Sequence, residues 1–491
     1  MIPRIRIFIL VVILAVGFAV RMYKIDNPIA DWHSWRQADT AAVTRNFVRY
    51  GVNLLYPRYD DFSDVSGRGL FNPEGYRMVE FPLFNLVHYT LREVFPFNSL
   101  EFWGRMTSVL SALASAVFIY LIVSRHASEK TAMLASFFYL LLPFNIYFTR
   151  VILPDPFMVT LYLVSLYFLD LWSVGSIFKF FLLSAFFGAL AVMVKPVAIF
   201  FLGVPAAWLF WKKYGFRFYR QKPLIILYSL YLVPFLVWRT WEHRHPEGIP
   251  GSIWLLNGDH IRFKGAFFRW IFGERLGNMI LGNWGILPLS AGIIAALSSG
   301  SYLLSWLAGA VLYLFTFASG NVRHDYYQIP ILPAVSVMLA LGVTALWKAE
   351  PSLLGTLGKR TLALISVLFM LSFSWYTLRG NYQINHWEII QAGRAVDRLI
   401  PGDATVIANY NGDTAFLYHT NRRGFTNVPL PVKDLIDRFG IDYYVSVNYD
   451  VATRDIMDIY TVVEEKPEYV IVRLEERPRH LITPTPTPGL L

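Results

Sequence analysis

The sequence lacks cysteine and has few charged residues. Because none of its 491 residues is cysteine, it cannot form disulfides, thiolate metal sites or cysteine nucleophiles. Only 16% of the residues are Asp, Glu, Lys or Arg, whereas 55% are hydrophobic and 17% aromatic, and the mean hydropathy is +0.43. Such a composition excludes an average soluble domain. It predicts a polytopic membrane protein.

The formal net charge of +10 could indicate a nucleic-acid partner. However, Lys and Arg are concentrated in short connectors between apolar runs, as the positive-inside rule describes for cytoplasmic loops. We therefore interpret the charge as a topological signal and expect no nucleic acid. The first apolar run, Ile7–Met22, follows Arg4 and Arg6 and resembles the core of a signal peptide. Since many further apolar runs follow it, we expect an uncleaved anchor.

Apolar runs recur along the first 380 residues. A transmembrane helix needs about 20 apolar residues, and tilted spans can differ in length. We expect about eleven spans on this basis, near 7–23, 102–124, 132–148, 156–172, 179–194, 196–211, 223–241, 279–298, 301–319, 327–347 and 361–378. All basic connectors then fall on one side, which we assign to the cytoplasm together with the N-terminus. One long broken helix over 179–211 is the alternative for that region, and Phe81–Phe95 is expected to be an interfacial helix.

The composition changes along the chain and predicts three regions. Residues 1–380 form a multi-span α-helical membrane domain, with an outer loop over 24–101. Residues 381–479 form a small extracytoplasmic α/β domain, and residues 480–491 form a Thr/Pro tail.

Alternating patterns locate the elements of the α/β domain. Ala404–Tyr410, Ile441–Asn448 and Glu468–Leu474 predict strands, and Val432–Phe439 predicts a helix. Asn385 and Glu388 fit a capping box that opens a helix ending near Leu399. Asn411-Gly412-Asp413 is typical of a turn.

The stretch Asp31–Thr40 gathers two carboxylates, an imidazole, a guanidinium and two indoles directly after the first apolar run. If Ala38–Tyr50 is a short helix closed by Gly51, Asp39 lies at its start. Its carboxylate can then cap the helix, which is the simplest interpretation, or reach into a cleft as a catalytic group.

Further charged residues are expected at the outer membrane surface. Asp155 lies between two prolines at the start of a span, where an N-cap is the simplest alternative. Lys195 lies between two apolar runs, and a charge inside a span costs roughly 2.5–3.5 kcal/mol, so it is expected to face a cavity or a counter-charge. Snorkelling to the interface is the alternative for Lys195. Glu80 ends the outer loop, where it can also be an ordinary solvated charge.

Arg323, His324, Tyr326 and Tyr327 open a late span. An aromatic belt explains the tyrosines but not the Arg-His pair. Together with Lys195, these residues predict an outer site that contains both acids and bases. There Lys195, Arg323 and Arg150 can hold a phosphate while a carboxylate performs proton chemistry. A lipid phosphate with a polar head fits such a site.

The order of these features resembles the C-type integral-membrane glycosyltransferases, and within them the protein O-mannosyltransferase and aminoarabinose-transferase group. The corresponding features are Asp39, Pro82-Leu83, Arg105, Arg150 with Asp155, Lys195, and Tyr326-Tyr-Gln-Ile-Pro330. The resemblance covers residues 1–350 and rests on order and topology. The stretch Trp35–Thr40 is similar to the corresponding stretch in a bacterial branch of this group.

The sequence departs from the family at two positions. The family usually has Asp-Glu where this chain has Asp39-Thr40, and Asp31 is the candidate for the missing carboxylate. The family often has His or Lys before Pro-Pro-Leu, where this chain has Glu80-Phe-Pro-Leu83.

The resemblance implies an enzyme that transfers a sugar from a polyprenyl-phosphate carrier to a lipid, glycan or protein, on the outer face of a bacterial cytoplasmic membrane. Asp39 would be the general base on an acceptor hydroxyl or would orient the nucleophile, Asp155 would position the acceptor or the sugar, and Lys195 with Arg323 would stabilise the leaving phosphate. Tyr326 or Tyr327 would line the donor pocket.

A transporter or flippase of lipid-linked sugar is the alternative function. It predicts charges near mid-bilayer and a repeat between halves, whereas here the charges lie at one face and the sequence shows no repeat. The sequence has no strong cluster of metal ligands, so we expect no cofactor, with a divalent metal as the alternative.

Overall fold

The computed structural model describes residues 3–348 and 355–476. The chain divides into two compact units, which we describe separately. The helical unit comprises Met1–Tyr59, Val65–Leu70 and Tyr76–Ile384, and the sheet unit comprises Asp60–Asp64, Phe71–Gly75 and Asn385–Leu491. The predicted Thr/Pro tail at 480–491 lies outside the described residues.

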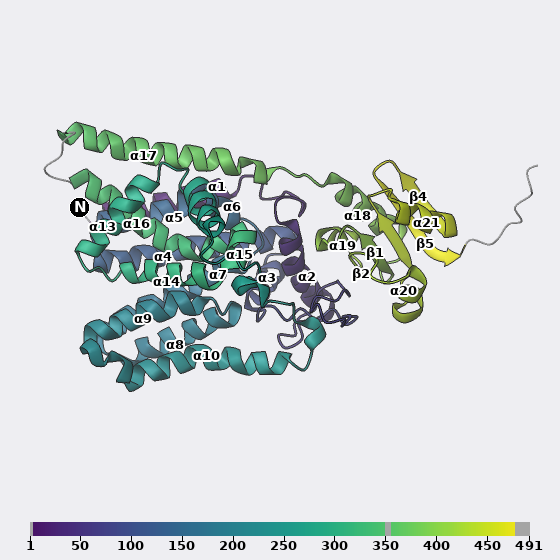
Figure 1. Ribbon diagram of the computed structural model, residues 1–491, viewed down its shortest axis with the longest axis horizontal. Helices are drawn as coiled ribbons and strands as arrows, with labels where there is room; N and C mark the ends of the chain where they lie inside the picture. The colour runs from purple at the N-terminus through teal and green to yellow at the C-terminus, as the bar shows by residue number, and fades with distance from the viewer. Residues whose placement is uncertain (1–2, 349–354, 477–491) are drawn as a thin grey trace, which may run out of the picture. The chain divides into compact units, whose positions relative to one another are not determined.

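The helical unit is built of α-helices joined by short turns and one long outer loop (Figure 1). Its helices are α1 (Pro3–Arg21), α2 (Ser34–Tyr50), α3 (Leu83–Val94), α4 (Leu100–His126), α5 (Glu129–Leu141), α6 (Pro143–Phe148), α7 (Asp155–Gly175), α8 (Phe178–Val194), α9 (Ala198–Tyr214), α10 (Lys222–Glu242), α11 (Trp254–Asn257), α12 (Gly265–Phe268), α13 (Ile286–Ser298), α14 (Leu304–Thr316), α15 (Ala318–Arg323), α16 (Leu332–Lys348) and α17 (Gly355–Leu378). Short 3₁₀ segments are η1 (Gly215–Arg220), η2 (Pro246–Gly248), η4 (Asp325–Ile331) and η5 (Arg379–Tyr382), and η3 (Arg269–Ile280) is a π-helix.

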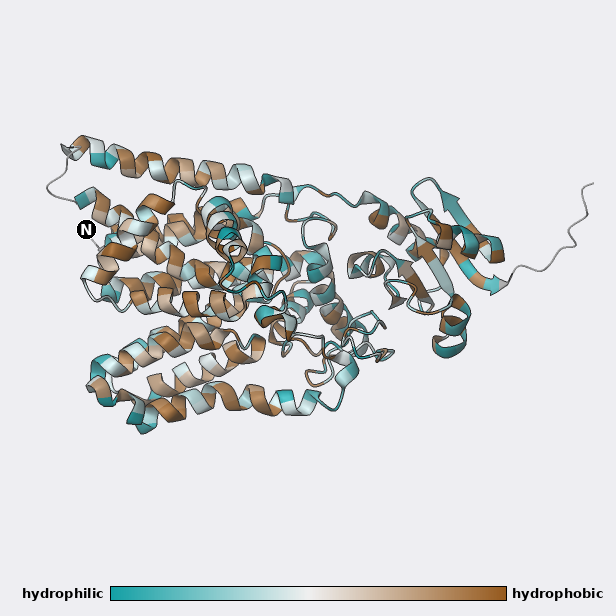
Figure 2. Cartoon of the chain, in the orientation of Figure 1, coloured by the Kyte–Doolittle hydropathy of each residue, from teal (hydrophilic) through white to brown (hydrophobic). Residues whose placement is uncertain are grey.

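The fold is that of a multi-pass membrane protein. Within the described residues, five helical stretches are long and apolar enough to cross a membrane: Leu100–His126, Asp155–Gly175, Lys222–Glu242, Asp325–Lys348 and Gly355–Leu399. Helices α8, α13 and α14 are shorter apolar helices. Figure 2 shows hydrophobic residues dominating these helices. The count of eleven spans stays a prediction.

The two helices expected over 179–194 and 196–211 are confirmed as α8 and α9, because the chain leaves helical geometry at Lys195 between them. Two other predicted boundaries in the helical unit are wrong. The expected span 132–148 is divided into α5 and α6 at Pro143, which cannot continue the hydrogen bonding of the helix before it. Helix α2 begins at Ser34 and not at Ala38, and its N-cap is His33. Asp39 therefore lies inside the helix and does not cap it.

Two buried arginines fix the segment between α1 and α2. Arg105 donates to the backbone carbonyl of Ile25 at 2.5 Å and to that of Asn27. Arg150 donates to the carbonyl of Lys24 and lies 3.2 Å from a carboxylate oxygen of Asp31. Because a buried guanidinium needs hydrogen-bond acceptors, these contacts hold the segment before α2 against α4 and the turn that follows α6.

The sheet unit is an α/β domain. Its helices are α18 (Trp387–Leu399), α19 (Thr414–Thr420), α20 (Val432–Phe439) and α21 (Val451–Ile459), and its strands are β1 (Thr405–Asn409), β2 (Arg423–Phe425), β3 (Tyr443–Ser446), β4 (Tyr460–Lys466) and β5 (Tyr469–Glu476). Over the described residues the strand order is β2-β1-β3-β5-β4, with β1 parallel to β2 and β3, and β5 antiparallel to β3 and β4.

The predicted strands at β1, β3 and β5, the predicted helix α20 and the turn at Asn411-Gly412 are confirmed. The predicted capping box at Asn385 is wrong: α18 begins at Trp387, its N-cap is His386, and Glu388 accepts instead from the Tyr410 hydroxyl at 3.1 Å.

A segment of the long outer loop belongs to the sheet unit. Phe62 N–H donates to the carbonyl of Gly424 at 2.7 Å, and Gly424 N–H donates to that of Asp60 at 2.9 Å. The Phe62 ring lies edge-on to Phe425, 5.8 Å between centroids. Gly424 is required here, because its φ is +151° and a Cβ atom would come 1.8 Å from the Val406 carbonyl oxygen. The loop thus adds an edge to the sheet beside β2.

Candidate functional site

Six charged side chains of the helical unit form a connected group, which we call the charged cluster: Arg36, Asp39, Arg77, Glu80, Asp155 and Lys195. Arg77 lies 2.5 Å from an Asp39 carboxylate oxygen. Arg36 is paired with Glu80. Lys195 Nζ lies 2.8 Å from Asp155 Oδ2 and 3.7 Å from Glu80 Oε1. Three carboxylates therefore balance three cations.

Helix geometry explains why these residues meet. Arg36 and Asp39 are three residues apart on α2 and so share one face of the helix. Asp155 is the first residue of α7, and Lys195 follows the last residue of α8, which packs antiparallel to α7. The N-terminal end of α7 and the C-terminal end of α8 therefore lie at the same end of the helical unit.

The N-cap interpretation of Asp155 is wrong, since the N-cap position of α7 is Pro154. Asp155 is 1% exposed, and its Oδ2 accepts from Lys195. Its other carboxylate oxygen, Oδ1, is buried and has no hydrogen-bond partner among the described residues. A buried acceptor without a donor is costly, so this oxygen is a suitable acceptor for a substrate hydroxyl.

The contacts of Lys195 do not fit an ammonium that snorkels to the membrane surface. Besides its two carboxylate neighbours, its Nζ atom lies 5.9 Å from the ring centroid of Tyr326 and 5.6 Å from that of Tyr327. A cation among aromatic rings and carboxylates inside the protein is held by charge and by the ring faces. The structure thus brings together five predicted site residues here: Glu80, Asp155, Lys195, Tyr326 and Tyr327.

A small cavity opens onto the cluster. It is lined by Arg36, Asp39, Thr40, Val43, Pro57, Arg77, Glu80, Phe81, Pro82, Phe84, Asn85 and Pro154, and it has room for about one water molecule. Asp39, at 4% exposure, therefore reaches a space that is shared with Glu80 and borders the start of α7.

Asp31 and Arg150 form a separate buried pair. Both side chains are fully buried, and Asp31 also accepts from the Gln37 side-chain amide at 2.8 Å. The Arg150 guanidinium lies 4.8 Å from the Tyr382 ring centroid. Gln37 and Tyr382 are not members of the charged cluster. The pair therefore anchors the segment before α2 and lies outside the cluster.

Arg323 also lies outside the cluster. Its side chain is 55% exposed and pairs with Asp259, with 2.8 Å from Nε to Oδ2. Hydrogen bonding from Arg323 holds the pKa of Asp259 below its usual value.

His324 connects α15 to η4 and lies in an aromatic group at the start of α2. Its ring centroid is 5.9 Å from that of His33 and 5.5 Å from that of Tyr326. His33 and Trp32 in turn bind the carboxylate of Asp325, at 2.6 and 2.8 Å. Burial, followed by the neighbouring His33, lowers the pKa of His324 to about 4. His324 is therefore neutral at pH 7 and adds no positive charge for a phosphate.

Sequence reasoning missed Arg36 and Arg77 as site residues. The three-residue spacing of Arg36 and Asp39 on one helix could have indicated that Arg36 is a site residue. Arg77 lies in the irregular outer loop, and its partner Asp39 is far away in sequence. Among residues 3–348 and 355–476, no group of three or more His, Asp or Glu side chains is placed to hold a metal ion.

Comparison with known proteins identifies the class of fold. Residues 82–241 match the family described as dolichyl-phosphate-mannose-protein mannosyltransferase. The chain has the fold of the C-type integral-membrane glycosyltransferases, and the predicted resemblance to the protein O-mannosyltransferase and aminoarabinose-transferase group is confirmed.

Two solved proteins illustrate this likeness. ArnT from Cupriavidus metallidurans, crystallised bound to undecaprenyl phosphate, superposes with a TM-score of 0.67 at 13% identity, over 94% of this chain and 97% of that one. The oligosaccharyltransferase AglB from Archaeoglobus fulgidus was solved in complex with an inhibitory peptide and a dolichol-phosphate. It superposes with a TM-score of 0.56 at 11% identity, over 90% of this chain and 69% of that one. Comparison with curated protein sequences gives no match.

Proposed function

We propose that this protein transfers a sugar from a polyprenyl-phosphate carrier to an acceptor on the outer face of a bacterial cytoplasmic membrane. The observation that carries the proposal is the charged cluster, where Lys195 lies beside the carboxylates of Asp155 and Glu80 and the rings of Tyr326 and Tyr327. Support also comes from ArnT and AglB, which share the fold and were solved with polyprenyl-phosphate lipids.

In this scheme the bond between the anomeric carbon and the carrier phosphate breaks, and its electron pair leaves with the phosphate. A new bond forms between the anomeric carbon and the acceptor oxygen. Asp39 accepts the proton that the acceptor hydroxyl loses.

Lys195 stabilises the negative charge on the leaving phosphate, with the Tyr326 and Tyr327 rings forming the wall beside it. Asp155 contributes its unpartnered Oδ1 as an acceptor for a sugar hydroxyl, which positions the donor. A lipid phosphate is already a good leaving group. The scheme therefore needs neither a separate general acid nor a metal ion.

The test is a comparison of lipid-linked and surface glycans by mass spectrometry, with and without the protein, followed by reconstitution. Proteoliposomes with a polyprenyl-phosphate sugar should release polyprenyl phosphate and form a glycosylated acceptor in equal amounts. If carrier-linked sugar crosses the membrane without being consumed, the protein is a flippase and not a transferase.

A further inference from the structure

A basic and aromatic surface lies at the end of the helical unit that is opposite the charged cluster. Helix α7 leads away from Asp155, α8 returns to Lys195, and α9 leads away from Lys195 again. The segment η1 joins α9 to α10 and therefore lies one helix length from the charged cluster (Figure 1). Since α10 begins at Lys222 and is long and apolar enough to cross a membrane, η1 lies at a membrane boundary.

Positive charge at this end has no acidic partner. Between Leu171 and Trp241 the sequence contains no Asp or Glu. Asp170, the last acid before this stretch, is buried and paired with Arg125 and His126. None of the cations around η1 forms an ion pair with another described residue; these cations are Lys212, Lys213, Arg217, Arg220 and Lys222. The surface therefore carries an uncompensated positive charge.

The 3₁₀ geometry of η1 sorts its side chains onto three faces, because residues three apart lie above one another. Phe218 is half-buried and packs against the core of the helical unit. Phe216 and Tyr219 share a second face and are 85% and 57% exposed. Arg217 and Arg220 share the third face and are both exposed. The segment thus presents two aromatic rings beside two guanidinium groups.

Backbone contacts fix the conformation of η1 without a ligand. Gly215 N–H donates to the Trp211 carbonyl and closes α9. The φ of Gly215 is +60°, which other residues rarely adopt, so glycine permits the turn into η1. The Tyr228 hydroxyl of α10 donates to the Gly203 carbonyl of α9 at 2.8 Å and ties together the two helices that η1 joins. The surface is therefore preorganised.

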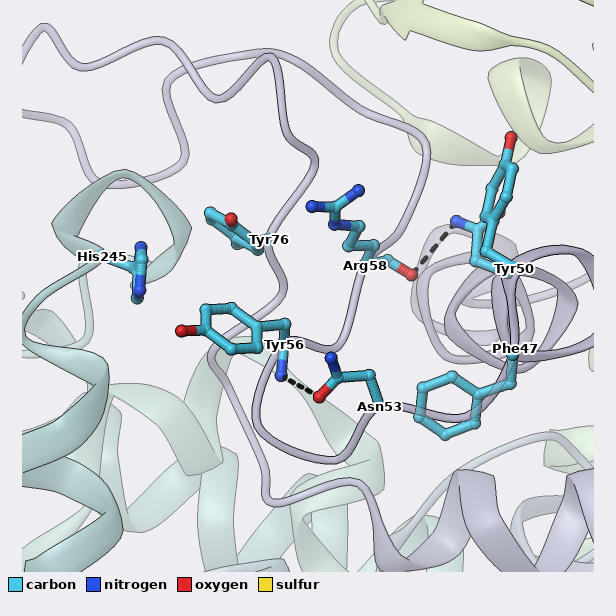
Figure 3. A pocket seen from close by; sticks show the side chains of 9 residues that line it. Phe47, Tyr50, Asn53, Tyr56, Arg58, Tyr76 and His245 are labelled. Atoms are coloured by element: carbon cyan, nitrogen blue, oxygen red, sulfur yellow. Dashed lines mark hydrogen bonds between the residues drawn. The ribbon is translucent and has the colours of Figure 1, made fainter.

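Aromatic rings at the other end of α10 contact one another instead. Tyr56, Tyr76 and His245 face each other around a cavity of about 490 Å³ (Figure 3). Their ring centroids are between 4.8 and 5.8 Å apart, and all three side chains are half-buried. Phe216 and Tyr219 are far more open. Exposed rings at a membrane boundary are suited to contact with lipid at the level of the headgroups.

We propose that η1 and the cations beside it bind the headgroups of anionic phospholipids. Guanidinium groups donate charge-assisted hydrogen bonds to phosphate oxygens, while the rings of Phe216 and Tyr219 lie against the upper part of the acyl chains. A headgroup with a net negative charge is favoured over a zwitterionic one, because the surface has no acid to balance its cations. Since this surface shares no residue with the charged cluster, lipid binding here is independent of sugar transfer.

This binding differs from the topological effect of basic connectors. Lys and Arg bias the orientation of a membrane protein wherever they lie within a connector. Lipid recognition, in contrast, depends on where the folded structure places Arg217 and Arg220 relative to the exposed rings. Removing these two arginines leaves three other cations in the connector, so it should change lipid binding without inverting the topology.

The test is native mass spectrometry of the full-length protein in detergent, titrated with phosphatidylglycerol or phosphatidylcholine of equal chain length. The wild-type protein should bind phosphatidylglycerol at least about tenfold more tightly. Each cation near an anionic lipid contributes about fivefold in affinity. Arg217→Gln with Arg220→Gln should therefore weaken phosphatidylglycerol binding by about ten- to thirtyfold and leave phosphatidylcholine binding unchanged. Arg217→Lys with Arg220→Lys should keep most of the affinity, because the charge is retained.

The matched control is Arg394→Gln with Arg454→Gln, which removes two exposed cations from the sheet unit and lowers the net charge equally. It should leave the binding of both lipids unchanged. Phe216→Ser with Tyr219→Ser should weaken both lipids by a similar factor, because the rings provide apolar contact and no charge. Thermal unfolding checks that each variant is folded.

Three results would overturn the inference. The first is equal affinity of the wild-type protein for the two lipids. The second is a loss of phosphatidylglycerol affinity in the Arg217 and Arg220 glutamine variant that is no larger than in the control. The third is unchanged binding of both lipids when Phe216 and Tyr219 are replaced by serine.

Discussion

Replacing Lys195 tests whether the cluster recognises a lipid phosphate. Lys195→Met keeps the length and the apolar stem of the side chain but deletes its charge. A charge-assisted contact contributes roughly 1.5–3 kcal/mol, so we expect the affinity for a polyprenyl phosphate to fall by about ten- to hundredfold. Lys195→Arg should recover part of it, because the charge is retained while the geometry changes.

The single variant has a second effect that must be separated from the first. Asp155 is 1% exposed and loses the donor to its Oδ2 atom when Lys195 is replaced. An unpaired buried charge of this kind costs roughly 3–5 kcal/mol of stability. The double variant Lys195→Met with Asp155→Asn removes the unpaired carboxylate and should regain most of the lost thermal stability.

Affinity is measured by titrating a polyprenyl monophosphate into nanodiscs that carry each variant. The double variant should be stable and still bind weakly, since the ammonium is absent. Wild-type affinity in a stable double variant would refute a phosphate-binding role for Lys195, and the loss in the single variant would then reflect unfolding alone.

Three further predictions address the base, the topology and the buried histidine. Asp39→Asn should reduce transfer by at least about a hundredfold with donor binding intact, as expected for a lost general base; near wild-type turnover in a purified assay would transfer that role to another carboxylate. An impermeant thiol reagent on intact cells should label Asn411→Cys and spare Tyr214→Cys, and the reverse pattern would invert the topology. Because the pKa of His324 is lowered to about 4, the folded state binds this proton less readily than the unfolded state does. The stability that His324 contributes is therefore complete above pH 6.5 and is lost as the pH falls from 6.5 toward 4. As the pH is lowered over this range, the melting temperature of His324→Gln should fall less than that of the wild-type protein.

The pairing of Asp155 with Lys195 could be predicted from the sequence, whereas the role of Arg77 could not. Two consecutive apolar helices with a short turn lie antiparallel, so the start of α7 and the end of α8 must share one end of the unit. Arg77, in contrast, is placed by backbone bonds from its loop to Pro57 and Gly248, and no local pattern encodes such contacts.

The same distinction holds in the sheet unit. Strands β1, β3 and β5 have apolar alternating patterns and were predicted. Strand β2 has only three residues, and β4 includes Glu464, Glu465 and Lys466. Neither strand therefore shows the alternation of apolar and polar residues that predicts a strand. The edge formed by the outer loop at Phe62 is a long-range contact that the sequence pattern cannot show.

The charge balance of the cluster leads to a final prediction about Glu80. Three carboxylates already neutralise three cations, so an incoming phosphate adds negative charge to a poorly hydrated site, and one carboxylate must move away. Glu80 is the best candidate, because it lies on the loop before α3, its side chain is 15% exposed, and its Oε1 is shared between Arg36 and Lys195. Glu80→Gln removes the competing charge with little change in shape. We expect it to tighten polyprenyl-phosphate binding by about tenfold, equivalent to roughly 1.4 kcal/mol, with Glu93→Gln, at an exposed pair on α3, as the matched control. Weaker binding by Glu80→Gln would mean that Glu80 orders the two cations for the phosphate and does not compete with it.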